Sequence, residues 1–338
     1  AINTMSELTP EIRALWGVTP STSAETVSFI RQLTLHEHRS TSTLKGKLSD
    51  LISSLTTMSP ESIGRQLECM TYKELDDEAF GLKYSAALRP CFIKNCCEVD
   101  SWRARERWTN VEIFVKHYGK VSLRVTEKRD IIAGANKPLR IPLENYLEYC
   151  ANDCGGADFP WYAFDDDFSK DRGLLVDDYV VPSYFKDDCY DVSPSARHIF
   201  PANRFFIVGG ARTGTPMHID PNATCAWNTL LLGHKRWVLF PPTPPKGMDG
   251  DTYIAAMGMK SKDEYSIRLV PPCRWWAEEY PRLAGGEGDA LGMIEYIQCP
   301  GETIFVPAGW WHVVLNLDVT IAITANPLLP RTLPHVWT

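Results

Sequence analysis

The chain has 338 residues, of which 44% are hydrophobic and 23% charged, and its formal net charge at pH 7 is −7. It is long and apolar enough to bury a large core, as one large β domain or as a domain with an appendage. The negative charge argues against a broad nucleic-acid surface, although it does not exclude a local basic groove. No stretch approaches the 18 apolar residues of a membrane span, so we expect no membrane association.

The ten cysteines bear on the cellular compartment. They form no C-x-x-C pair and show no regular spacing. In a chain of this length such cysteines indicate reduced thiols, so we expect an intracellular protein, nuclear or cytoplasmic. The first residues show no signal-peptide pattern. Cys150 and Cys154 are a weak zinc candidate.

Residues 1–75 predict a helical appendage. Thr22 and Glu25 are spaced as a capping box. Leucine and isoleucine recur with helical spacing from Leu44 to Leu55, and Ser59-Pro60 is a typical helix start. We expect this appendage to pack on the main domain or to precede it. The alternative is a module that docks a partner.

Residues 76–338 are expected to form one domain. Aromatic residues between 102 and 118 suggest helices that cover a sheet, and short strands separated by Gly and Pro dominate after Arg204. Eight such strands predict a mainly β fold, a double-stranded β-helix or jelly roll as in cupins, with a core at about 204–326. An insertion at about 246–292 is too long for a hairpin and suggests a lid or interface element. The predicted strands span 204–209, 215–220, 224–232, 235–240, 295–299, 303–306, 312–317 and 319–326.

A His-x-Asp sequence at His218 and Asp220, followed far downstream by His312, has the ligand set of a non-heme iron(II) site. Residues two apart on a strand lie on the same face, so one strand can direct both His218 and Asp220 to a metal. His312 must then come from another strand. None of the other seven histidines has Asp or Glu two positions later.

Polar residues also fall at positions expected to face inward. His312 and Asn316 share strand parity, as do Thr320, Thr324 and Asn326. Inward polar groups are costly unless they are paired, so they suggest a barrel lined by a ligand. For Thr324 and Asn326 an outward, solvated face is an equal alternative.

Asn228 and Lys235 lie near the ends of the strands that follow the His-x-Asp sequence. A dicarboxylate that chelates iron at one end needs a cation for its far carboxylate, and Lys235 is placed to supply it.

Residues 204–326 resemble the Jumonji-C family of iron(II)- and 2-oxoglutarate-dependent oxygenases. Within that family the chain is most similar to the phosphatidylserine-receptor-like branch of lysyl hydroxylases and arginine demethylases. The shared text includes Gly-Thr-x-x-His-Ile-Asp-Pro, Gly-His-Lys-Arg-Trp and Pro-Gly-Glu-Thr-x-Phe-Val-Pro-x-Gly-Trp-Trp-His. A weaker match extends upstream to about residue 76. The chain lacks the basic tracts and polyserine tail of that branch, and its 246–292 insertion differs, so we expect the insertion to help select the substrate.

The resemblance implies a set of site residues. Iron(II) would be held by His218, Asp220 and His312. The cosubstrate 2-oxoglutarate would be held by Lys235, Thr215, Asn228, Tyr162 and Thr324. Trp311 and Asn326 would lie near the substrate.

The resemblance also implies an activity. The expected function is O2-dependent hydroxylation of a side chain in a protein or peptide substrate, lysine favoured. The alternatives are N-methyl demethylation of arginine or lysine, RNA hydroxylation, disfavoured by charge, and a non-catalytic binding scaffold. The sequence leaves the target and the oligomeric state open.

Overall fold

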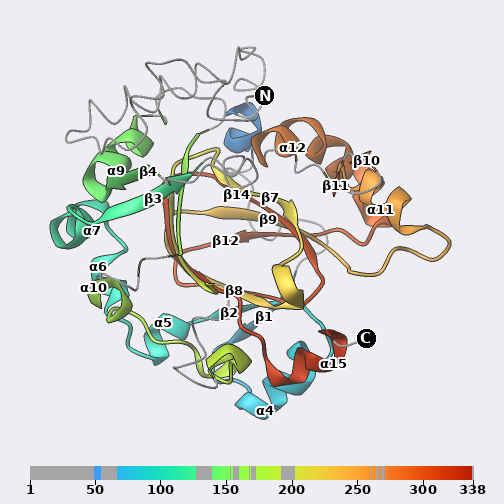
Figure 1. Ribbon diagram of the computed structural model, residues 1–338, viewed down its shortest axis with the longest axis horizontal. Coiled ribbons are helices and arrows are strands. Elements are labelled where there is room, and N and C mark those ends of the chain that lie inside the picture. Colours follow the sequence, from blue (N-terminus) through green and yellow to red (C-terminus); the bar gives the residue numbers. More distant parts are fainter. Residues whose placement is uncertain are drawn as a thin grey trace.

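Two sheets face each other and enclose the interior of the protein (Figure 1). The computed structural model describes residues 49–54, 67–126, 139–152, 154, 160–166, 168, 173–191, 202–259, 261–263, 266–267, 270 and 272–336. One sheet has the strand order β1-β2-β13-β8-β15-β6-β5-β3-β4, and the other has the order β12-β9-β14-β7. This arrangement confirms the predicted jelly roll.

All eight predicted strands are present, and most boundaries agree within two residues. They are β6 (Arg204–Gly209), β7 (Gly214–His218), β8 (Ala226–Leu232), β9 (Lys235–Phe240), β12 (Ile294–Gln298), β13 (Thr303–Val306), β14 (Trp311–Asn316) and β15 (Thr320–Ala325). One boundary was wrong in a way that matters. The strand of the His-x-Asp sequence ends at His218, and Asp220 begins a 3-10 turn at Pro221–Ala223.

The described residues between 67 and 191 extend the large sheet and cover its outer face. Their strands are β1 (Glu68–Thr71), β2 (Cys91–Lys94), β3 (Ser122–Thr126), β4 (Leu139–Pro142) and β5 (Tyr162–Asp165). Their helices are α4 (Asp77–Phe80), η3 (Gly81–Ser85), α5 (Cys96–Val99), α6 (Ala104–Arg107), α7 (Val111–Tyr118), α9 (Leu143–Ala151), α10 (Gly173–Val176), η5 (Ser183–Phe185) and η6 (Cys189–Asp191). The predicted covering helices are confirmed, because Trp108 and Phe114 pack edge-on or tilted against Phe206 of β6. The five strands were not predicted.

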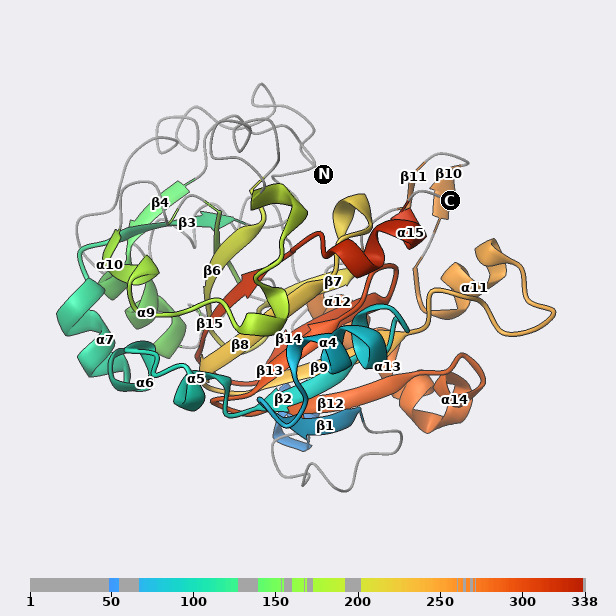
Figure 2. The ribbon, with the colours of Figure 1, turned by 90° about the horizontal axis from the view of Figure 1, so that it is seen from below.

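The insertion covers the outer face of the four-stranded sheet, on the opposite side of the barrel from α7 and α9 (Figures 1 and 2). It contains α11 (Gly250–Ala256), β10 (Ser261–Asp263), β11 (Ser266–Ile267), α12 (Pro272–Glu278), α13 (Tyr280–Arg282), η9 (Leu283–Glu287) and α14 (Gly288–Ala290). Trp275 and Trp276 pack in one cluster with Val238 and Val313 of the sheet. Arg236 of β9 is fully buried and donates to the Tyr280 hydroxyl of the insertion. Arg236 and Tyr280 both donate to the Glu295 carboxylate of β12.

Two parts of the predicted appendage are described, a helical segment at residues 49–54 and residues 67–75. The second part was wrongly predicted as helical, because it contains strand β1, which pairs with β2 in the large sheet. Leu51 and Ile52 are half-buried against the cluster formed by the insertion and the four-stranded sheet. This segment therefore packs on the main domain, as expected. The capping box at Thr22 and the helix start at Ser59-Pro60 lie outside the described residues, and the boundary at residue 75 stays a prediction.

Two short elements complete the described fold, η10 (Pro330–Thr332) and α15 (Leu333–Val336). No helix among the described residues is long and apolar enough to cross a membrane.

Polar and apolar side chains both line the space between the sheets. Trp237, Leu239, Ile304, Val306 and Val314 form an apolar cluster there. Because side chains alternate along a strand, Lys235 faces inward with Trp237, and His312 and Asn316 face inward with Val314. The candidate site is built from these inward polar side chains.

Candidate active site

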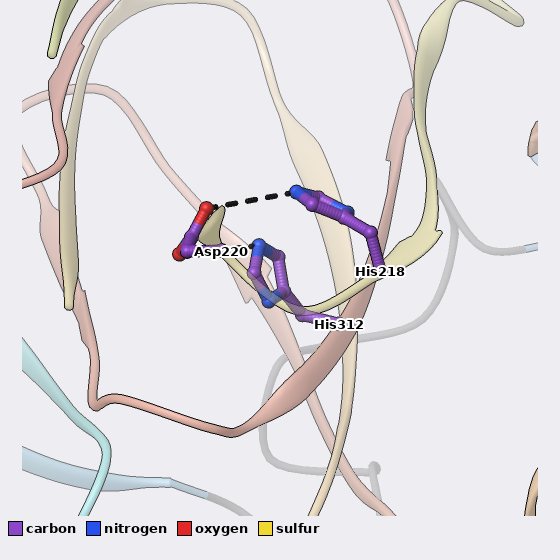
Figure 3. A group of neighbouring side chains, drawn as sticks. All are labelled: His218, Asp220 and His312. Atoms are coloured by element: carbon purple, nitrogen blue, oxygen red, sulfur yellow. Dashed lines mark ion pairs between the residues drawn. The ribbon is translucent and has the colours of Figure 1, made fainter. Parts of the chain in front are cut away.

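His218, Asp220 and His312 converge on one point (Figure 3). Each offers a ligand atom, and these atoms all lie within 4.8 Å of one another. The His218 Nε2 lies 3.7 Å from Asp220 Oδ1, and the His312 Nε2 lies 3.8 Å from Asp220 Oδ2. Both distances exceed a hydrogen bond and leave room for an ion between the atoms. In the described part of the chain, this is the one such group of three or more metal-ligating side chains.

The two histidine rings are oriented by backbone carbonyls. The Nδ1 of His218 lies 2.7 Å from the Pro216 carbonyl oxygen, and the Nδ1 of His312 lies 3.1 Å from that of Trp310. A carbonyl oxygen only accepts, so each Nδ1 carries a proton, and Nε2 is the ring atom that can bind a metal. This is the arrangement that a metal-ligating imidazole needs.

The side chain of Asp220 is only 9% exposed, and its carboxyl is ionised at neutral pH. Burial by itself would raise the pKa of its carboxyl, but the neighbouring His312 and His218 outweigh that effect and the pKa lies below its ordinary value. Its Oδ2 atom is buried and accepts no hydrogen bond. A buried carboxylate oxygen without a donor is costly unless a cation meets it, so this donor set fits a divalent metal.

Thr215 reaches the interior because β7 is irregular. His218 pairs with His312, Thr215 pairs with Val314, and the register shifts between these pairs. In a regular strand Thr215 and His218, three residues apart, would lie on opposite faces. The bulge adds a residue to β7, so both face inward with their cross-strand partners.

Lys235 places a buried amine in the interior, opposite Asn316 of β14. It is 1% exposed, and its Nζ donates to the Tyr162 hydroxyl at 3.2 Å. None of the described residues forms an ion pair with it. Burial lowers the pKa of Lys235 to about 7, and the more distant Asp318 opposes this shift only in part. The amine therefore fits an anionic ligand that would restore its charge.

The remaining predicted cosubstrate residues, Asn228, Thr324 and Tyr162, lie on the large sheet, and Tyr162 contacts this amine. Asn228 pairs with Thr324 across β8 and β15, and Asn228 Oδ1 is buried without a hydrogen-bond donor. The Thr324 hydroxyl donates to the Trp227 carbonyl at 2.7 Å. Tyr162 is buried, and burial raises its pKa, so its hydroxyl stays protonated at neutral pH.

The two predicted substrate residues are placed differently. Trp311 pairs with Phe240, which packs in the outer cluster, so Trp311 lies on the opposite face of β14 from His312. Asn326 follows β15, and its Nδ2 donates to the Cys225 carbonyl at 3.5 Å. The Asn326 side chain also contributes to the lowered pKa of Asp220.

Two residues that were not predicted lie beside Lys235 and Tyr162. Asn316 pairs with Lys235, and its Nδ2 donates to the Thr213 hydroxyl at 2.7 Å. Its inward parity was visible in the sequence, but no role was drawn from it. A Cβ added to Gly209 would lie 2.6 Å from both Asn316 Nδ2 and Tyr162 Cε2, so any larger residue would force these side chains to move.

The weak zinc candidate gains no support. Cys150 and Cys154 are free and buried, and within the described residues they belong to no group of three metal-ligating side chains.

Comparison with known proteins agrees with the predicted cupin-like fold. A family model described as "cupin-like domain" matches residues 77–326. The bifunctional arginine demethylase and lysyl-hydroxylase psr-1 of Caenorhabditis elegans is 37% identical over 241 residues, covering 70% of this chain and 56% of that protein.

Two further relatives carry related names. Lysine-specific demethylase JMJ21 of Arabidopsis thaliana is 35% identical over 251 residues, covering 74% of this chain and 24% of that protein. The 2-oxoglutarate and iron-dependent oxygenase JMJD4 of Mus musculus is 26% identical over 263 residues, covering 73% and 57%. The chain thus spans little more than half the length of these relatives, or less.

Proposed function

The chain belongs to the cupin-like domain family, and on that premise we propose that it is an iron(II)- and 2-oxoglutarate-dependent dioxygenase that hydroxylates a protein side chain, with lysine as the favoured target. One observation carries the proposal. A two-histidine, one-carboxylate group shares one interior with a buried lysine that has no ion-pair partner among the described residues.

Three residues would bind the metal, and a fourth would bind the cosubstrate. His218, Asp220 and His312 would hold iron(II) on one face. Iron(II) with bound 2-oxoglutarate supplies the oxidation that inserts one atom of O2 into a substrate C–H bond, while the cosubstrate loses CO2 and becomes succinate. Lys235 would bind the far carboxylate of 2-oxoglutarate, because the buried amine regains its charge beside an anion.

The polar residues around Lys235 would orient the cosubstrate. Tyr162 holds a proton on its hydroxyl and can donate it to a carboxylate. Asn228 and Thr324 line the interior from β8 and β15, and Thr215 lines it from β7. The apolar residues Ile207, Leu230 and Ala322 lie beside Tyr162 and limit the water around the amine.

A lysine target is supported by the name of the C. elegans relative, which includes lysyl hydroxylation. The direct test is mass spectrometry of lysine- and methylarginine-containing peptides after incubation with iron(II), 2-oxoglutarate and O2. A gain of one oxygen atom on lysine is the expected result. Peptides unchanged in mass although 2-oxoglutarate is consumed would reject these side chains as targets.

N-methyl demethylation is the second candidate function. The names of the C. elegans and A. thaliana relatives favour it. The same site chemistry would hydroxylate a methyl carbon attached to nitrogen, and the product would lose that carbon as formaldehyde. In the same assay, loss of one methyl group and release of formaldehyde would identify this reaction.

The two remaining alternatives are tested with the same protein. A non-catalytic scaffold would neither bind 2-oxoglutarate through Lys235 nor turn it over. An RNA hydroxylase would modify oligonucleotides in place of peptides. The ten free thiols support an intracellular protein, in the nucleus or the cytoplasm, and cell fractionation tests this location.

A further inference from the structure

The carboxylate of Asp188 joins three parts of the chain at the rim of the barrel. Its Oδ1 accepts hydrogen bonds from the backbone N–H groups of Tyr190 and Leu328, each at 3.0 Å. Its Oδ2 accepts from the Asn203 side-chain amide at 2.7 Å. Cys189, beside it, donates its N–H to the Leu328 carbonyl at 2.9 Å. The loop at residues 187–191 is therefore attached both to the start of β6 and to the segment that follows β15.

The segment at residues 326–328 is held from two sides. The Asn326 N–H donates to the Asn203 carbonyl at 2.7 Å, on the side of Asp188. On the other side, the N–H and the thiol of Cys225 both lie within hydrogen-bonding distance of the Pro327 carbonyl, at 3.3 and 3.2 Å. These bonds restrict the backbone of Asn326 to one path.

Asp220 is the member of the candidate triad whose orientation depends most on such support. The two histidines lie on paired strands, and carbonyl oxygens orient their rings. Asp220 lies beyond the end of β7, in a turn whose Asn222 has a φ of 55°. The Asn326 Nδ2 donates to the carbonyl of Cys225 at 3.5 Å, so residues 326 and 327 both bond to Cys225, which follows the turn of Asp220. The Asn326 side chain also contributes to the lowered pKa of Asp220.

We propose that Asp188 and Asn203 are positioning residues that fix residues 326–328 against Cys225, which follows the turn of Asp220, and so orient this candidate metal ligand. The inference rests on the proposed metal site but assigns residues that lie outside it. Asp188 and Asn203 touch neither metal nor substrate. They act through the path of residues 326–328, and partners of this kind typically change metal affinity by about 10- to 100-fold.

The test exchanges the two partners and measures metal binding, using Co(II) alone as the probe in the whole chain. Asn203→Asp places two carboxylates face to face and breaks the bond. The double variant Asp188→Asn/Asn203→Asp restores a bond between an amide and a carboxylate with the donor reversed. Asp191→Asn is the matched control, because Asp191 lies on the same loop and pairs with Arg204 at the surface.

We expect Asn203→Asp to weaken Co(II) binding by about tenfold and to change the visible spectrum of the bound ion. The double variant should return to within about twofold of the unaltered protein, and Asp191→Asn should not differ from it. If Asn203→Asp does not fold, recovery of folding and of Co(II) affinity in the double variant supports the proposal, and failure of that recovery overturns it.

Two outcomes separate this inference from the proposed function. Co(II) binding that does not depend on His312 would overturn the metal site, and this inference with it. A His312-dependent Co(II) site that Asn203→Asp leaves unchanged, or that the double variant does not restore, would overturn the inference alone.

Discussion

His312 and His218 lie directly opposite each other in the register of β14 and β7, and their ring centroids are 4.1 Å apart. The pairing of two strands far apart in the sequence therefore brings the two candidate ligand rings together. Both rings are held by backbone carbonyls, so little rearrangement is needed for a metal to bind. The arrangement depends on the barrel being closed and not on either histidine alone.

Removal of one ligand should abolish metal binding. In His312→Ala two ligands remain, and we expect iron(II) affinity to fall by more than the roughly 10- to 100-fold that loss of an outer partner costs. Metal content after dialysis and succinate release measure this effect. His117→Ala, on the exposed surface of α7, is the control. Retained metal and turnover in His312→Ala would show that the triad is misassigned.

Lys235→Met should separate cosubstrate binding from folding. Methionine keeps the apolar stem but removes the charge, so 2-oxoglutarate binding should weaken by about 2–5 kcal/mol, or at least about thirtyfold. Without 2-oxoglutarate, at pH 6, the variant should be the more stable protein, because no charge has to be buried. Titration calorimetry and thermal melts test both points. A change in affinity below threefold contradicts the role. Lys235→Arg should also weaken binding, because its head group is larger and planar.

The pH dependence of binding follows from the same amine. In the folded protein the pKa of Lys235 is lowered to about 7, so between pH 7 and about 10.5 the unfolded chain holds a proton that the folded protein lacks. Its contribution to the free energy of unfolding should therefore rise with pH across this window. A bound carboxylate restores the charge, so at pH 8 binding should take up close to one proton.

Calorimetry in two buffers of different ionisation enthalpy measures this proton uptake. Tyr162 faces the amine, and burial raises the pKa of its hydroxyl, so Tyr162 stays neutral in this range. Lys235→Met should show no uptake. If the unaltered protein also takes up no proton at pH 8, the amine already carries its charge before the cosubstrate binds.

Gly209→Ala should disturb the pocket from the side of the large sheet. The new methyl group would lie 2.3 Å from the Thr213 hydroxyl and 2.6 Å from Asn316 Nδ2, so these side chains must move. We expect destabilisation of about 1–3 kcal/mol and weaker 2-oxoglutarate binding. Gly285→Ala is the control, because a Cβ there meets nothing within 4 Å. Equal cosubstrate affinity in the two variants would show that the pocket does not extend to Gly209.

Much of the fold could be predicted because its signals are local. The eight strands after Arg204 could be predicted from the alternation of apolar and polar residues and from Gly and Pro at their ends, and all eight are present. The strands β1 to β5 were missed because they are four or five residues long and lie among helices, where short apolar runs do not distinguish the two structures. Their place in the large sheet depends on partners elsewhere in the chain.

The sequence by itself determined which chemical groups can meet at the site, because residue type and strand parity are properties of short segments. It indicated His218, Asp220, His312 and Lys235 on this basis. Only the tertiary structure decided how these groups are held. The bulge in β7, the Asn316–Thr213 bond across 103 residues and the Asp188–Leu328 bond across 140 residues exist only once distant strands pair. The alternation of apolar and polar residues along a strand predicts which face of the sheet each residue lies on. The register between strands is set by the packing of the whole barrel.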